Sequence, residues 1–329
     1  MADSSPVSLT SQSHAIPVGK TDQGENVLSN GVSGEAALSI CVPAFKDSAD
    51  ALLASLVRLP GAEQCTLLIF DDGSDDPELT RLLARQILRF PGPARLITAP
   101  ANAGRAHARN RLIALAETDW ILFLDADMRP DEDDFLTCYL DAATRHDEPA
   151  LIAGGFSLKH AHTTDETRLH AAQSLTSECI DAEDRALEPG RYVFTSNILV
   201  HRDILQTVKF DDAFQGWGWE DVDWGLRIAE RYPIEHINNT ATHLGLDSEI
   251  ALMTKYGSSA SNFALALERH PTALKQTPLY KAARLISRFP GRGLVQNISS
   301  AIARRRAFPM TVRLFGLKLY RAAVYAKVL

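Results

Sequence analysis

The chain has 329 residues, a length that favours one large domain with appendages over two full domains. Its hydrophobic content of 45% and charged content of 23% are typical of a globular protein, and no run of about 18 apolar residues occurs, which argues against a transmembrane helix. The net charge of −7 is uneven: residues 271–329 hold twelve Lys or Arg and no Asp or Glu, so residues 1–270 carry −19.

The first 36 residues are rich in Ser, Gly, Asn and Thr and hold no apolar core behind a basic start. This composition predicts a disordered N-terminal tail over residues 1–36 and not a signal peptide. The four cysteines, Cys41, Cys65, Cys138 and Cys179, occur singly within apolar runs, without C-x-x-C spacing. We interpret them as reduced core thiols of a cytoplasmic protein.

Short apolar runs alternate with helical patterns from residue 38 onward. The predicted strands are residues 38–45, 65–72, 94–99, 119–127 and 150–155, and the predicted helices are residues 48–59, 77–89, 104–116 and 131–145. This alternation predicts an α/β fold with a mostly parallel, Rossmann-like central sheet flanked by helices. Neither G-x-G-x-x-G nor a P-loop motif occurs, which disfavours dinucleotide oxidoreduction and P-loop chemistry.

Polar and acidic residues follow three of these strands, at residues 43–47, 71–74 and 125–127. Because ligands of such sheets bind at the carboxyl ends of the strands, we expect a site at this edge. Asp125 and Asp127 in "FLDADM" are suited to a hard cation such as Mn²⁺ or Mg²⁺ that bridges carboxylates to phosphates. In "FDDGSDD", Asp72 is placed to accept a hydrogen bond from a nucleobase, while Asp75 or Asp76 caps the next helix.

The segment "NAGRAHARN" opens the predicted helix 104–116. Its glycine and the side chains of Arg105 and Arg109 suit an anionic ligand at a helix N-terminus. We place Arg111 on a solvated basic face.

The segment "GWGWEDVDW" precedes and begins a helix that Pro233 ends. Acids in a first helical turn are explained by the helix dipole alone, but the tryptophans in front of them are not. Gly216 and Gly218 allow a tight turn, and the indoles of Trp217 and Trp219 offer flat faces for a sugar. Trp224 is predicted to lie in the core.

These segments, together with "SICVPAFKD" and "FTSNILVHRD", resemble the family-two glycosyltransferases of the GT-A type. The resemblance covers residues 38–268 and rests on six motifs in order. It implies a GT-A domain over residues 37–270, in which residues 37–155 bind a nucleotide-sugar and residues 156–270 bind the acceptor. The G-W-G-x-E-D motif of this chain is similar to that of galactosyl- and N-acetylgalactosaminyl-type transferases, and this similarity favours a UDP-sugar as the donor.

The resemblance also implies roles for individual residues. Glu220 would hold the acceptor, together with Trp217, Gly218 and Trp219, and Asp221 would be the catalytic base of an inverting transfer. Asp223, two positions on, is an alternative to Asp221 that the sequence leaves open. The donor would contact Pro43, Phe45, Asp72, Arg105, Arg109 and Asp125, and the metal would be bound by Asp127, Asp125 and His243.

Residues 271–329 mix aromatic and aliphatic residues with Arg and Lys, which predicts a basic amphipathic helical extension. An anionic membrane surface and a cap on the acidic body are both compatible with it, and nucleic acid is disfavoured. The resemblance implies a glycan or lipid-linked glycan acceptor, as in bacterial surface polysaccharide synthesis, at the inner face of the cytoplasmic membrane. A nucleotidyltransferase and a non-catalytic glycan- or lipid-binding scaffold remain alternative functions.

Overall fold

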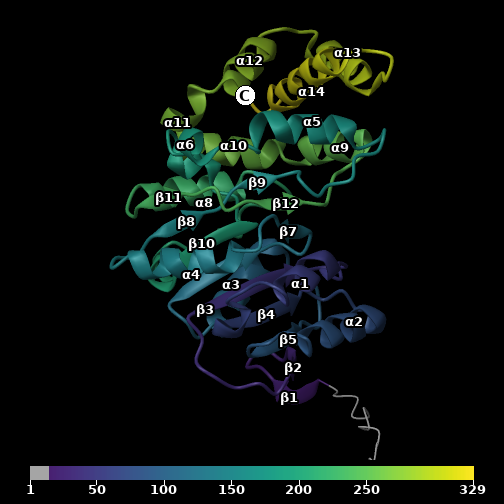
Figure 1. Cartoon of the computed structure of the whole chain (residues 1–329). Helices are drawn as coiled ribbons and strands as arrows, with labels where there is room; N and C mark the ends of the chain where they lie inside the picture. The colour runs from purple at the N-terminus through teal and green to yellow at the C-terminus, as the bar shows by residue number, and fades with distance from the viewer. Residues whose placement is uncertain (1–14) are drawn as a thin grey trace, which may run out of the picture.

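The computed structural model describes residues 15–329 and shows a mixed α/β fold built on a nine-stranded sheet (Figure 1). The strand order is β1-β2-β5-β4-β3-β6-β10-β8-β11. The strands are β1 Ile16–Lys20, β2 Asn26–Ser29, β3 Leu38–Ala44, β4 Cys65–Asp71, β5 Ala94–Thr98, β6 Trp120–Leu124, β8 Leu151–Ala153, β10 Asn197–His201 and β11 Ile234–His236.

The four central strands, β5, β4, β3 and β6, are parallel, as the sequence predicts. They are apolar and β-branched because both of their faces are covered by helices. Towards the edges the pairing changes, since β10 lies antiparallel between β6 and β8, and β2 lies antiparallel to β5. The sheet is therefore parallel in its centre and mixed overall.

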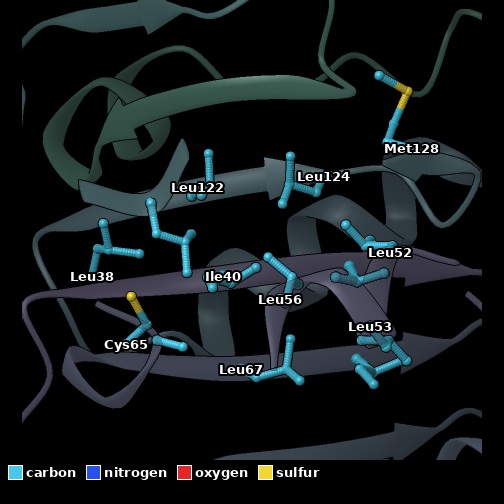
Figure 2. Packing of buried hydrophobic residues seen from close by; sticks show 14 of the residues in the cluster. Leu38, Ile40, Leu52, Leu53, Leu56, Cys65, Leu67, Leu122, Leu124 and Met128 are labelled. Carbon is cyan, nitrogen blue, oxygen red and sulfur yellow. The ribbon is translucent and has the colours of Figure 1, made fainter. Parts of the chain in front are cut away.

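Helices pack on both faces of the sheet. On one face, α1 Asp50–Leu56, α2 Pro77–Ile87 and α4 Phe135–Arg145 form a core with the strands, and Figure 2 shows Leu52, Leu53 and Leu56 packed over Ile40 and Leu67. On the other face lie α3 Arg105–Leu115, α7 Arg202–Thr207 and α8 Glu220–Ala229. Trp224 of α8 is fully buried there against Phe210, which confirms its prediction as a core residue.

A second, three-stranded sheet lies beside the carboxyl end of β6. It consists of β7 Met128–Pro130, β12 Ala241–His243 and β9 Phe156–Ser157, with β12 in the middle. The antiparallel register of β12 and β7 sets His243 opposite Met128. This pairing brings a histidine from far along the chain to the residue that follows Asp127.

The prediction of a disordered tail over residues 1–36 is wrong for its second half, and residues 1–14 lie outside the described residues. The strands β1 and β2 form a hairpin that adds to the edge of the sheet through β5. The hairpin is held by Glu25, whose carboxylate lies 2.6 Å from the Nε of Arg111 in α3. Arg111 is therefore buried in an ion pair and not on a solvated basic face, because Glu25, in the turn between β1 and β2, comes from the segment predicted as tail.

The remaining helices lie towards the end of the molecule opposite the hairpin of β1 and β2 and continue into the C-terminal extension (Figure 1). They are α5 Arg168–Ser177, α6 Ala182–Arg185, α9 Glu249–Ser258, α10 Ala260–Arg269, α11 Pro271–Lys275, α12 Pro278–Ser287, α13 Arg292–Arg304 and α14 Met310–Tyr325, with 3₁₀ turns η1 Ala62–Gln64 and η2 Pro189–Tyr192. Within residues 15–329, no helix combines the length and apolar character that crossing a bilayer requires.

The extension is helical, as predicted, and α14 packs against α5, α9, α10, α12 and α13. Arg313 of α14 is buried and pairs with Glu249 of α9 at 2.6 Å. This part of the extension is a cap on the acidic body. All four cysteines are free thiols; Cys41 and Cys65 are buried, whereas Cys138 and Cys179 are partly exposed and do not belong to the inner core.

Candidate active site at the carboxyl edge of the sheet

A cleft of about 930 Å³ opens where β3, β4 and β6 end. It reaches from the turn after β3, past the N-terminus of α3, to the N-terminus of α8. The predicted site residues that line it are Pro43, Phe45, Asp72, Arg105, Arg109, Asp125, Asp127, Trp217, Glu220, Asp221 and His243. Gly218 and Trp219 do not line it. The fold thus brings together residues that are up to 200 positions apart in the chain.

The walls of the cleft are strongly acidic. Among its lining residues three are Lys or Arg, namely Arg105, Arg109 and Lys255, and nine are carboxylates: Asp47, Asp72, Asp125, Asp127, Glu178, Asp212, Glu220, Asp221 and Asp247. An anionic ligand such as a diphosphate would be repelled by this excess of negative charge, because charges in a partly desolvated cleft are poorly screened. The charge balance therefore favours a ligand that binds together with a cation.

Asp72 holds the loop that leads into α3. Its Oδ2 accepts hydrogen bonds from the side-chain amide of Asn102 at 2.8 Å and from the backbone N–H of Gly104 at 2.8 Å, and its Oδ1 accepts one from Ala103 at 3.1 Å. The next residue, Gly73, has φ 69°, and a Cβ there would lie 2.2 Å from the carbonyl carbon of Ala101. Asp72 lines the cleft where a nucleobase was predicted, but the hydrogen bonds of its carboxylate go to this loop.

The turn after β4 also carries the predicted cap. Asp76 accepts hydrogen bonds from the backbone N–H groups of Glu78 and Leu79, so it is the N-cap of α2. Asp71, which is fully buried, accepts a hydrogen bond from the hydroxyl of Ser74 at 2.5 Å. Burial raises the pKa of Asp71, which fits a carboxyl that shapes the turn and does not face the cleft.

Asp127 and His243 form the strongest candidate for a metal-binding pair. The Oδ2 of Asp127 lies 3.1 Å from the Nε2 of His243, a separation that suits two donors on one ion. Burial raises the pKa of Asp127, but the hydrogen bond and charge of His243 outweigh it and lower the pKa overall. Gly245 leaves room for this pair, because a Cβ there would lie 2.3 Å from the Asp127 carboxylate. The oxygen and imidazole donors suit Mn²⁺.

Asp125 is engaged differently from Asp127. Its Oδ1 accepts a hydrogen bond from the Nη2 of Arg109 at 2.7 Å, and Arg109 is 3% exposed. Within residues 15–329, no group of three or more metal-ligating side chains is gathered in ligand geometry, so Asp125 does not join Asp127 and His243 in one cluster. Arg109 also lies close to the charges of Asp221 and Glu220, which raise its pKa against the effect of burial. Arg109 therefore places a positive charge between Asp125 on one side of the cleft and the acids of α8 on the other.

Glu220 and Asp221 enter the cleft from the first turn of α8. Asp221 is held by Thr195: the Thr195 hydroxyl donates to Oδ1 at 2.8 Å, and its backbone N–H donates to Oδ2 at 3.4 Å. Burial raises the pKa of Asp221, against the charge of Arg109. Burial and the neighbouring charge of Asp221 raise the pKa of Glu220 to about 7. Within the described residues, the buried Oε2 of Glu220 has no hydrogen-bond partner.

Asp223 points away from the cleft. It is fully buried beneath α8, where it accepts from Arg227 at 2.8 Å and lies 3.0 Å from the Nε2 of His270 and 3.3 Å from Arg269. Residues two positions apart on a helix lie on nearly opposite sides. Of the two alternatives that the sequence left open, Asp221 alone lines the cleft.

The glycine–tryptophan turn has the tight backbone that its sequence predicts. Gly216, Gly218 and Trp219 all have positive φ, at 77°, 88° and 77°. Asn262 of α10 holds the turn by donating to the carbonyl oxygens of Gln215 and Gly218, each at 3.0 Å.

The two tryptophans of this turn point in different directions. Trp217 lines the cleft, beside Tyr256 at a ring separation of 5.8 Å. Trp219 instead packs among the C-terminal helices, where its indole donates to the hydroxyl of Tyr325 at 3.0 Å and contacts Phe263. The side chain of Trp219 therefore does not lie in the cleft, where an acceptor contact was predicted. Its partners, Phe263 of α10 and Tyr325 of α14, are far along the chain, and the local sequence does not reveal them.

Sequence reasoning missed several residues that shape the site. Thr195 lies within the quoted motif "FTSNILVHRD" and could have been found there, whereas Asn262, Lys255 and Tyr256 carry no local signal. Arg321 of α14 lies over the rings of Trp219, Tyr256 and Tyr325, at 4.8 to 5.5 Å from their centroids. The C-terminal extension thus packs behind the wall of the cleft, because Tyr256 lies between Arg321 and Trp217, which lines the cleft.

Comparison with known proteins gives one family match. The model of the family described as glycosyl transferase family 2 matches residues 39–208, slightly more than half of the chain. No curated protein sequence matches.

Among solved structures, the chain is similar to the mannosyltransferase PcManGT from Pyrobaculum calidifontis, solved in complex with GDP-Man and Mn²⁺. The identity is 14%, the coverage is 90% of each chain and the TM-score is 0.55. S. aureus TarS in complex with UDP is also 14% identical, with 88% of this chain and 90% of that chain covered and a TM-score of 0.45. The first of these likenesses supports the fold.

Proposed function

The chain belongs to glycosyl transferase family 2, and we propose that it transfers a sugar from a UDP-sugar to a hydroxyl group of a glycan or lipid-linked glycan, with inversion at the anomeric carbon. The observation that carries this proposal is the arrangement of two pairs on one cleft. Asp127 and His243 are in contact on one side, and Glu220 and Asp221 enter from the N-terminus of α8. Glycosyl transfer requires both a site for the diphosphate and a base for the acceptor.

The donor would occupy the half of the cleft formed by β3, β4 and α3. Pro43 and Phe45 would contact the nucleobase, and the exposed side chain of Arg105 is available to the phosphates. Asp72 contributes through the loop 102–104, which it fixes beside the cleft. Arg109, being paired with Asp125, would position that carboxylate near the ribose.

Asp127 and His243 would hold a divalent cation, Mn²⁺ or Mg²⁺. Their oxygen and imidazole donors fit such an ion. A cation would also offset the repulsion between a diphosphate and the nine carboxylates that line the cleft. When bound, the ion would neutralise the charge that develops on the departing diphosphate. PcManGT, which shares this fold, was solved with GDP-Man and Mn²⁺, so a GDP-sugar is the competing donor.

The acceptor would occupy the half of the cleft beside Trp217. Glu220, whose buried Oε2 has no hydrogen-bond partner among residues 15–329, would accept a hydrogen bond from an acceptor hydroxyl. Asp221 would take the proton of the attacking acceptor hydroxyl. In the same step the acceptor oxygen would form a bond to the anomeric carbon, and the bond between that carbon and the diphosphate would break. Thr195 would hold Asp221 in position for this step.

A nucleotide-sugar panel tests the proposal. UDP- and GDP-sugars are incubated with the full chain and Mn²⁺, and both thermal stabilisation and release of nucleoside diphosphate are measured. A metal-dependent response to one nucleotide is expected, with UDP favoured. No response to any nucleotide-sugar, with or without metal, would contradict the proposal, and a response to nucleoside triphosphates with pyrophosphate release would favour a nucleotidyltransferase.

A further inference from the structure

The outer surface of the C-terminal helices exposes large apolar side chains. We name this surface, formed by α12, α13, α14 and their connecting loops, the C-terminal face; it lies at the end of the molecule opposite the hairpin of β1 and β2 (Figure 1). Its apolar residues are each between 39% and 65% exposed: Leu285, Phe289, Leu294, Ile298, Phe308 and Phe315. Exposed large apolar residues that gather on one set of packed helices mark an interaction surface.

The helix α13 exposes two of its large apolar residues, Leu294 and Ile298, whereas Val295 and Ile302 are partly buried on the side that faces the protein. Leu294 and Ile298, one turn apart, are 64% and 51% exposed, whereas the buried positions on its inner side are Ser299 and Ala303. The small inner residues allow α14 to approach closely, since a Cβ at Gly316 would lie 3.0 Å from the backbone nitrogen of Ala303. A helix that only packed on the protein would place Leu294 and Ile298 inward as well. The outer stripe of α13 is therefore available for a contact outside this chain.

The charge of the C-terminal face identifies the kind of contact. Residues 271–329 contain no Asp or Glu, and exposed basic residues accompany the apolar ones: Arg284, Arg288, Arg292, Arg304, Arg305 and Lys318. A second copy of this face would bring two sets of positive charges together, which disfavours a symmetric dimer. A nucleic acid would attract the charge but leave Leu294 and Ile298 without an apolar partner.

We propose that the C-terminal face binds the surface of a bilayer that contains anionic lipid, with its apolar side chains inserted among the acyl chains and its Arg and Lys at the headgroups. Basic amphipathic helices bind membranes in this way, and each Lys or Arg near the surface adds attraction. The rest of the molecule, residues 1–270, carries −19, so an anionic bilayer repels it and orients the protein with this face towards the lipid. The inference does not depend on the transferase activity.

The inference is tested by flotation of the full chain with vesicles of phosphatidylcholine alone and of phosphatidylcholine mixed with phosphatidylglycerol. The chain is expected to float with the anionic vesicles at low salt, and less at high salt. The variant Arg288→Glu/Arg305→Glu should reduce the bound fraction roughly tenfold or more. The matched control, Arg81→Glu/Arg85→Glu on the distant helix α2, should leave binding unchanged.

The apolar contribution is tested separately with Leu294→Ser/Ile298→Ser, for which Leu175→Ser/Leu187→Ser, two leucines exposed outside this face, is the control. Only the first variant should weaken binding, and circular dichroism should show both folded. Absence of flotation by the wild-type chain at low salt would overturn the inference. So would a stable dimer in solution that Leu294→Ser/Ile298→Ser dissociates, or binding to double-stranded DNA that exceeds binding to vesicles.

Discussion

Asp221 and Asp223 lie in the same helical turn of α8 but belong to different parts of the protein. Asp221 lines the cleft and accepts a hydrogen bond from Thr195, whereas Asp223 is buried on the other side of the helix with Arg227, Arg269 and His270. The separation of about 200° between such positions on a helix explains why one acid can serve chemistry while the other serves stability. This relationship yields a prediction that compares two matched substitutions.

The two aspartates should respond differently to replacement by asparagine. Asp221→Asn removes the proposed base, so kcat should fall by about 10²- to 10⁴-fold with little change in the melting temperature. Asp223→Asn removes the charge that its three partners share, so it should lower the free energy of unfolding by about 1–3 kcal/mol while kcat falls little. Thermal unfolding and initial rates on both variants check this. A large loss of kcat in Asp223→Asn with normal stability would contradict the assignment of the base.

Asp127 and His243 should control the dependence on metal. Chelation with EDTA should abolish thermal stabilisation by the nucleoside diphosphate, and Mn²⁺ should restore it in the wild-type chain. In Asp127→Asn and His243→Ala, Mn²⁺ should no longer restore it, because each variant lacks one of the two donors. Asp212→Asn, which changes an exposed acid on the same cleft, is the matched control. Full Mn²⁺-dependent stabilisation in Asp127→Asn would exclude this residue as a ligand.

The pKa of Glu220 predicts how activity changes with pH. Because burial and the charge of Asp221 raise this pKa to about 7, Glu220 is largely protonated in acid and ionised above neutrality. The proposed role is to accept a hydrogen bond from the acceptor, which the carboxylate does best, so kcat/KM should rise with pH through about 7. Glu220→Gln, which cannot ionise, should have a lower kcat/KM and lack this inflection. An unchanged inflection in the variant would assign it to another group.

The raised pKa of Glu220 also predicts how the stability of the folded chain changes with pH. Between the ordinary pKa of 4.5 and the raised pKa of about 7, the folded chain holds a proton on Glu220 that the unfolded chain has lost. The contribution of this residue to the free energy of unfolding therefore falls as the pH rises through that interval. Urea unfolding of the wild-type chain and of Glu220→Gln at about pH 5 and about pH 8 should show a larger gain for the variant at the higher pH.

The sequence predicted the part of this site that lies close to strand and helix ends, because local patterns determine those positions. Asp72, Asp125 and Asp127 follow buried strands, and Asp76 is the cap that its place before Pro77 indicates. The positions of Trp219 and Arg111 could not be predicted in the same way. Trp219 turns towards Tyr325, which is 106 residues away, and Arg111 pairs with Glu25, which is 86 residues away. Such partners depend on tertiary packing, and a helical pattern does not contain them.

Thr195 should position Asp221 without taking part in proton transfer. Thr195→Val removes the hydroxyl that donates to Asp221 at 2.8 Å while keeping the shape of a residue that is 1% exposed. We expect kcat to fall by roughly 10- to 100-fold with little change in KM, since a base that is held loosely loses its alignment. Thr195→Ser retains the hydroxyl and should restore most of the activity. A loss in the serine variant as large as that in the valine variant would contradict this role, because the retained hydroxyl would then be insufficient to hold Asp221.

The ion pair between Arg111 and Glu25 should attach the N-terminal hairpin to the domain. Both residues are buried, and the guanidinium makes two hydrogen bonds to the carboxylate, at 2.6 and 2.8 Å. Arg111→Met leaves the carboxylate buried without its partner, so it should lower the free energy of unfolding by about 3–5 kcal/mol. The double variant Glu25→Gln/Arg111→Met removes both charges and should recover a large part of that loss. If the double variant is no more stable than Arg111→Met in urea unfolding, the pair is not what holds the hairpin.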